Sequence, residues 1–155
     1  MLIAGVFIIF AVSHARAADK DEDKAKEVTL SFLKAVKAKD LDAVMKTVDA
    51  PFVIEFGSKS SKMFEKADEL KMAMMKFLEM VTPEKVPTEV GTVYDMASLA
   101  KLAKEKGEDD LFATVEKLVG KTGFMVRMKT KEDSEEGGIF VRMKDGKAFI
   151  AAIPK

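Results

Sequence analysis

Few residues in this chain are of a type that could do chemistry. It contains one histidine, His14, one tyrosine, Tyr94, and no cysteine. The lack of cysteine excludes disulfides, thiolate metal ligands and cysteine nucleophiles. His14 lies in a segment that we expect to be removed, so the mature chain would also lack the usual general base near neutral pH. We therefore expect no zinc site, no Ser-His-Asp chemistry and no cofactor.

The candidate site residues are Tyr94 and Asp95, at the end of a segment that reads as a strand. A phenol beside a carboxylate can orient a ligand at the rim of a pocket. The alternative is a tyrosine that packs its ring and leaves its hydroxyl in water. The sequence leaves both interpretations open.

The methionines raise the question of a copper(I) site, because thioethers are soft ligands. Five of the eleven lie close together in the sequence: Met63, Met72, Met74, Met75 and Met80. Helical spacing puts Met74 on a core face and Met72 nearly opposite, so their sulfur atoms would not converge, and we interpret the cluster as core filler. The acidic runs 108–110 and 132–136 lack the ligand spacing of a calcium loop. We expect no metal site.

Length and charge narrow the class of protein. The chain has 155 residues, which suits one domain. Its 26 basic and 26 acidic residues leave no net charge. Without a basic excess, binding to nucleic acid is disfavoured.

The beginning of the sequence has the pattern of a secretory signal. An apolar run from Met1 to Val12 is followed by small residues at Ala15 and Ala17, which form an A-x-A cleavage site. The run is shorter than the roughly 20 residues that span a bilayer as a helix, so we expect no membrane span after cleavage. We predict a cleaved signal at 1–17 and an exported protein, periplasmic or secreted. The alternatives are an uncleaved anchor or a buried N-terminal helix.

The rest of the chain is predicted to be a mobile charged lead-in at 18–26 and a single domain at 27–155. Three- and four-residue spacing of apolar side chains predicts helices near 25–36, 41–48, 66–80, 96–106 and 110–119. Alternation and β-rich composition predict strands near 52–56, 62–64, 88–94, 124–129, 138–144 and 147–153. Asp145-Gly146 is a strong hairpin signal. This order favours an α+β domain, a curved antiparallel sheet with helices packed on its concave face.

Two segments resemble a known superfamily. Residues 32–45 read FLKAVKAKDLDAVM and residues 51–56 read PFVIEF. An amphipathic helix, an Asp-Leu-Asp-Ala helix start and a first strand resemble the opening of the nuclear transport factor 2-like superfamily, which includes ketosteroid isomerases and polyketide cyclases. The resemblance implies a cone-shaped fold that encloses a pocket and is often dimeric through the outer sheet face. Some relatives are enzymes and many others only bind or assemble.

Strand alternation separates the expected inner and outer sheet faces. The inner face would be nearly all Phe, Ile, Val and Met, with no obvious acid or base. The outer face would carry Glu55, Met125, Arg127, Phe140 and Arg142. We interpret these five as a homodimer interface or as a solvated face with cross-strand ion pairs. The helices near 96–119 would form a lid or cover a sheet edge.

The sequence thus predicts an exported, non-enzymatic domain that binds a small apolar ligand or a protein partner, as a homodimer. The alternative is a small isomerase, dehydratase or hydrolase of the same superfamily that uses Tyr94 and a nearby carboxylate.

Overall fold

The structure, a computed structural model, describes the backbone of residues 4–56, 59–129 and 134–154 and the side chains of these ranges from residue 19 onward, except that of Phe56. The helices are α1 (Ala4–Ala38), α2 (Leu41–Met45), α3 (Ala67–Met80), the 3-10 helix η1 (Pro83–Lys85), α4 (Met96–Lys106) and α5 (Asp109–Val119). The strands are β1 (Val48–Phe56), β2 (Lys62–Phe64), β3 (Glu89–Asp95), β4 (Phe124–Lys129), β5 (Glu135–Lys144) and β6 (Lys147–Pro154).

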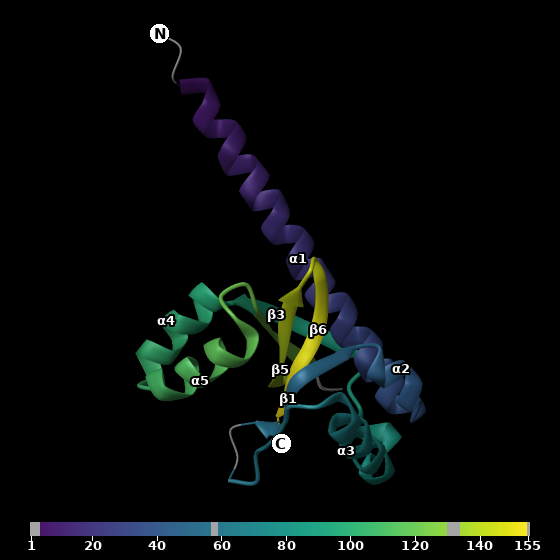
Figure 1. The fold of residues 1–155 in the computed structure, drawn as a ribbon. Coiled ribbons are helices and arrows are strands. Elements are labelled where there is room, and N and C mark those ends of the chain that lie inside the picture. Colours follow the sequence, from purple (N-terminus) through teal and green to yellow (C-terminus); the bar gives the residue numbers. More distant parts are fainter. Residues whose placement is uncertain (1–3, 57–58, 130–133, 155) are drawn as a thin grey trace.

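The strands form one six-stranded sheet in the order β2-β1-β6-β5-β4-β3 (Figure 1). The α+β class is confirmed, but the sheet is mixed rather than antiparallel throughout, because β1 and β6 run parallel. Hairpin signals fix the direction only of strands that follow each other along the chain. The pairing of β1 with β6 depends on tertiary packing between distant parts of the chain, and no local sequence pattern predicts it.

The predicted turns and caps formed. Asp40 caps α2 by accepting a hydrogen bond from the Ala43 backbone N at 2.9 Å. Asp145 and Gly146 both have positive φ, 52° and 73°, as a tight two-residue hairpin requires. These features were predictable because each depends on residues close together in the sequence.

Helix α1 begins earlier than the expected start near Ala25. It runs without a break through the charged segment, whose side chains form helix-spaced ion pairs, Lys24 with Asp21 at 3.0 Å and Lys26 with Glu22 at 2.9 Å. Its N-terminal half stands clear of the sheet (Figure 1). The division into signal, mobile lead-in and domain stays a prediction, and residues 1–3 of that signal lie outside the described residues. No described helix has the length and apolarity that a membrane crossing needs.

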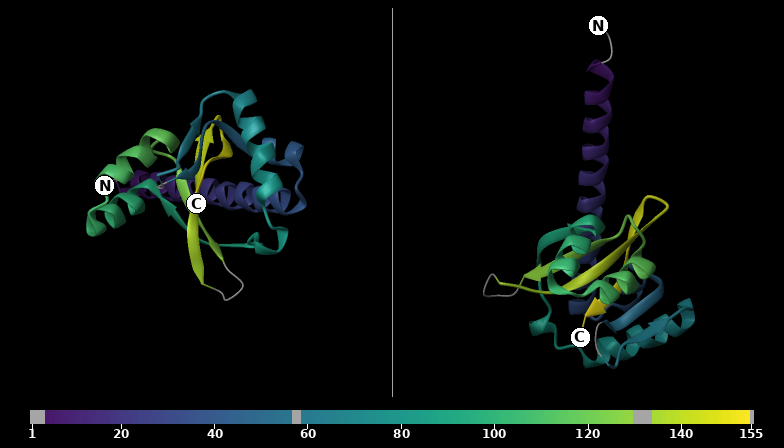
Figure 2. Two further views of the ribbon diagram at one scale, coloured as in Figure 1. Left: turned by 90° about the horizontal axis from the view of Figure 1, so that it is seen from below. Right: turned by 90° about the vertical axis from the view of Figure 1, so that its left-hand side faces the viewer.

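Helices cover the sheet from both sides (Figure 2). On one face, α1, α2 and α3 bury a core that contains Phe52, Val126 and Ile139. On the other face, α4 and α5 cover a second core around Val53 and Phe140. Alternate strand residues therefore separate as predicted. Instead of covering only an edge, α4 and α5 cover part of the outer face.

Candidate functional site

Tyr94 and Asp95 lie where β3 ends and α4 begins. The Asp95 carboxylate accepts a hydrogen bond from the Ser98 backbone N at 2.7 Å and so caps α4. Hydrogen bonds from Ser98 lower the pKa of this carboxyl group, so it is an ionised acceptor at neutral pH. Tyr94 is half-buried and lies opposite Met125 in the ladder between β3 and β4. The cavities described below are lined by other residues.

Two of the residues expected at a homodimer interface are covered by the chain itself. Phe140 is buried and Met125 packs beside it, under side chains of α4 and α5 that include Met96, Val115 and Val119. The helices between β3 and β4 thus occupy the surface that these two side chains were expected to offer to a second chain. The homodimer itself stays a prediction.

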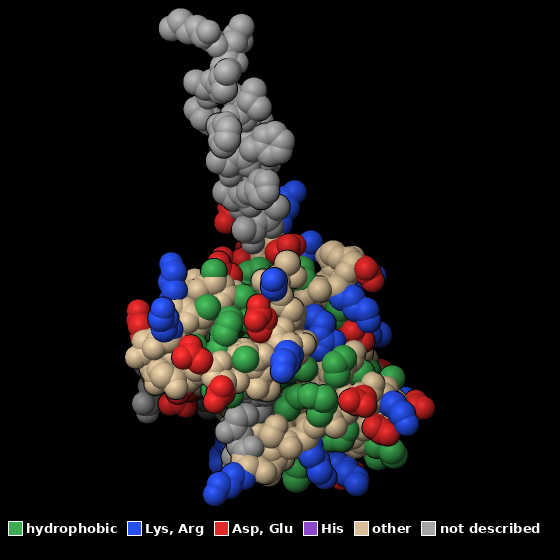
Figure 3. Space-filling model, turned by 60° about the vertical axis from the view of Figure 1, so that its left-hand side comes forward, with side chains coloured by type: hydrophobic (Ala, Val, Ile, Leu, Met, Phe, Trp, Pro, Cys, Tyr) green, Lys and Arg blue, Asp and Glu red, His purple; other side chains and the backbone are tan. Residues whose placement is uncertain are grey.

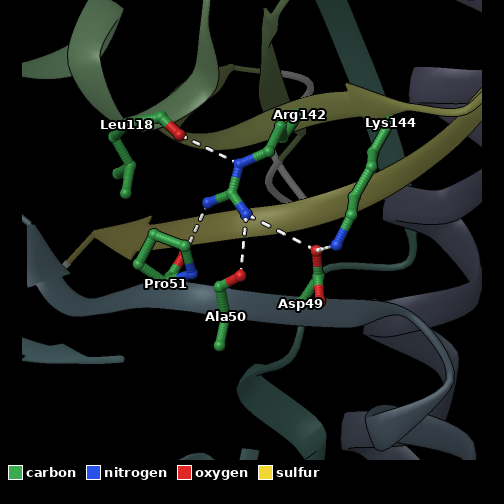
Figure 4. Close-up of polar contacts among 6 residues, drawn as sticks. All are labelled: Asp49, Ala50, Pro51, Leu118, Arg142 and Lys144. Atoms are coloured by element: carbon green, nitrogen blue, oxygen red, sulfur yellow. Dashed lines mark hydrogen bonds and ion pairs between the residues drawn. The ribbon is translucent and has the colours of Figure 1, made fainter. Parts of the chain in front are cut away.

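Arg142 is the centre of a polar cluster on this covered side (Figure 4). Its Nε donates to the carbonyl oxygen of Leu118 at 3.0 Å, and its Nη atoms donate to the carbonyl oxygens of Ala50 and Pro51, at 3.2 and 2.5 Å. Asp49 lies 3.6 Å from Nη1. Burial lowers the pKa of this guanidinium group, an effect that Asp49 partly offsets. Arg142 thus uses its donors on acceptors within the protein, so its role is structural.

The other charged residues of the predicted outer face are also engaged differently than expected. Arg127 donates from Nη2 to the Glu135 carbonyl oxygen at 2.6 Å. Asp49, rather than Glu55, is the carboxylate that pairs with Arg142. Glu55 has a positive φ of 55° near the end of β1 and lines the groove described below.

An apolar hollow lies on the opposite side of the sheet, between α1, the end of α3, η1 and the strands. This apolar cavity has a volume of about 370 Å³. Its lining residues are Phe32, Leu33, Val36, Phe77, Met80, Val81, Thr82, Lys85, Val86, Pro87, Met128, Ile139, Ile153 and Pro154. The volume falls within the range of about 300–1,000 Å³ that is typical of small-molecule sites.

A second hollow, of about 700 Å³, adjoins the cavity between α3, β1 and β2, and we name it the methionine groove. Its lining residues are Ile54, Glu55, Ser60, Lys62, Met63, Phe64, Glu69, Met72, Ala73, Lys76, Phe77, Met80, Val81, Ile153 and Pro154. Hydrophobic side chains gather at the lower right of the space-filling view, where α3 lies (Figure 3).

The methionines of this region are mostly surface residues. Met74 is fully buried in the core, as predicted. Met63, Met72, Met75 and Met80 are exposed, with Met80 at 78% exposure, so the interpretation of the whole cluster as core filler is wrong. Exposed methionines form adaptable apolar binding surfaces because their side chains are flexible and polarisable. Among the described residues, no group of three or more His, Cys, Asp or Glu side chains is placed to hold a metal ion.

Part of this site was predictable from the sequence. Phe77 in α3 and Val81 just after it follow the apolar spacing that predicts this helix, and both are half-buried against the core while they line the cavity. The position of η1 beside α1 depends on the path of the chain between α3 and β3. No periodic pattern predicts that path, so Lys85 and Val86 were missed.

The chain matches no protein-family model and no curated protein sequence. Among solved structures, it is similar to a protein of unknown function with a cystatin-like fold from Nostoc punctiforme, with 13% identity, a TM-score of 0.43 and coverage of 81% of this chain and 82% of that one. It is also similar to an NTF-2-like protein of unknown function from Shewanella oneidensis, with 18% identity, a TM-score of 0.42 and coverage of 84% and 93%.

Proposed function

We propose that this protein binds a small apolar ligand in the apolar cavity and does not transform it. The observation that carries the proposal is the composition of the wall: among its described residues, Lys85 is the only ionisable side chain and Thr82 the only other polar one. An apolar ligand that binds against such a wall gains about 25 cal/mol of free energy for each Å² of apolar surface that it buries. General acid–base catalysis needs a positioned proton donor and acceptor, and the described residues of this lining include no carboxylate or imidazole.

A neutral fluorescent probe tests the proposal. We expect N-phenyl-1-naphthylamine to bind the full chain saturably, with enhanced emission. Val81→Trp places a large ring where the cavity meets the groove, so we expect it to weaken binding at least about tenfold, a loss of about 1.4 kcal/mol. Val86→Phe, which fills the cavity from η1, is a second blocking variant in case the first does not fold.

The matched control is Leu111→Trp, on α5 at 42% exposure, away from the cavity lining. It adds the same ring to the surface, and we expect it to leave the probe affinity within about twofold of the parent. The proposal fails if the parent shows no saturable binding, or if folded blocking variants bind as well as the control.

We also propose that the protein is exported, on the support of the apolar run and the A-x-A site at Ala15 and Ala17. Expressed as the full chain in its own host, the protein should be recovered with Ala18 as its first residue, as read by N-terminal sequencing. An Ala17→Leu variant should block cleavage, because the site needs a small residue there. Recovery of the parent with an intact Met1 would contradict the proposal.

A further inference from the structure

We infer that the ligand of the apolar cavity is a single-chain amphiphile with an anionic head, such as a long-chain carboxylate, with its head at Lys85 and its chain along the cavity and the methionine groove. The inference rests on the proposed function and specifies its ligand. Three observations carry it: the position of Lys85, the charges of the hollows on either side of the cavity, and the adjacency of the cavity and the methionine groove.

Lys85 lines the apolar cavity and is in contact with solvent. It is the last residue of η1 and is exposed, so its ammonium group keeps its hydration. Within the part of the chain that the structure describes, no carboxylate forms an ion pair with it. A lone cation that lines an apolar cavity and contacts solvent is complementary to a ligand whose apolar part is buried and whose negative end stays near water.

The charges of the neighbouring hollow show why the head would stay at this point. Lys85 also lines a polar hollow of about 990 Å³, whose other walls carry Glu84, Glu89 and Glu136 as well as lysines. These carboxylates line the polar hollow and not the apolar cavity. An anion that moved outward would meet as many carboxylates as lysines and gain no net attraction, whereas Lys85 is the one charged side chain among the described residues that line the apolar cavity.

The far end of the path explains the preference for a single long chain. The apolar cavity and the methionine groove share the lining residues Phe77, Met80, Val81, Ile153 and Pro154, so they are adjacent and a chain that passes these side chains would run from one into the other. The described lining of the groove beyond includes Met63 and Met72 and carries both signs of charge, with two lysines and two glutamates. The methionine groove therefore does not favour a second charged group on the ligand. A flexible hydrocarbon chain fits a long path with flexible methionine walls.

The test is displacement of N-phenyl-1-naphthylamine from the full chain by decanoate, decanol and decylammonium, which share one chain and differ in the head. We expect decanoate to bind most tightly. Lys85→Met should weaken the binding of decanoate about two- to fivefold, which is the size expected for loss of an exposed charge pair. It should leave the affinity for decanol unchanged. Lys85→Glu should weaken the binding of decanoate further. The control is Lys104→Met, at an exposed position on α4, which should change the affinity for neither ligand.

The length of the chain is tested in the same assay. From octanoate to dodecanoate, each added methylene should improve the affinity about threefold to fourfold while it is buried. A plateau after octanoate would contradict a ligand that extends into the methionine groove.

The head assignment is overturned if decylammonium binds as tightly as decanoate, or if Lys85→Met weakens decanoate and decanol equally. In both cases the probe would still bind, and the apolar site of the proposed function would stand. If the probe itself does not bind the parent, the proposed function fails first.

Discussion

Replacing Arg142 with methionine is expected to lower the free energy of unfolding by about 3 kcal/mol. Methionine keeps much of the aliphatic volume but donates no hydrogen bond. The side chain of Arg142 is only 13% exposed, so water does not readily replace what the substitution removes. Urea unfolding followed by circular dichroism measures the change through the transition midpoint.

The expected loss of stability is large because the carbonyl groups that accept from Arg142 would have few other donors. Leu118 lies in the last turn of α5, where carbonyl groups lack partners within the helix. A guanidinium group there both caps the helix and complements its dipole. Ala50 and Pro51 lie where the register between β1 and β6 shifts, so the ladder is interrupted at their carbonyls. Arg142 thus joins the end of α5 to an irregular stretch of β1.

Two variants separate this role from a general loss of charge. Lys144 also pairs with Asp49, at 2.9 Å, but its side chain is 55% exposed. Lys144→Met is therefore expected to cost less than about 1 kcal/mol. Arg142→Lys keeps the charge without the planar fork and should fall between the two. Equal and small losses from Arg142→Met and Lys144→Met would contradict the structural role. Probe binding in the opposite cavity should be unchanged in each folded variant.

Arg142 also shows how far the sequence determines the structure. Strand alternation placed it on the correct face of β5, because that face follows from a two-residue period. Its partners lie 24 residues away at Leu118 and about 91 residues away at Pro51. Contacts at such separations depend on where α5 ends relative to β1. No local pattern in one sequence records that relation.

The difference between local patterns and long-range contacts also explains why the helices and strands were predicted more completely than the site. Helices α4 and α5, the strands β4 to β6 and the hairpin turn follow from spacing and turn chemistry over a few residues. The second core under α4 and α5 was missed because Met125 and Phe140 alternate with charged residues, a pattern that a solvated face also shows. The resemblance implied a pocket, but its lining was not predicted for a related reason, since its walls combine α1, η1 and β6, which are distant in the sequence.

Met74 and Met72, on α3, give the last prediction a matched pair. Met74 is fully buried and Met72 is 58% exposed, although they are two residues apart on the same helix. Met74→Ala should lower the free energy of unfolding by about 2–5 kcal/mol, because it leaves a cavity in the core. Met72→Ala should change it by no more than about 0.5 kcal/mol, because the site is already hydrated.

The pair tests whether the exposed methionines serve stability or binding. Both substitutions have the same change in helix propensity, so unfolding in urea compares burial alone. If Met72→Ala cost as much as Met74→Ala, the methionine groove would be a packed part of the core and no chain could enter it. With stability retained, the Met72→Ala variant should bind dodecanoate more weakly and octanoate as the parent does, because only the longer chain reaches that part of the groove.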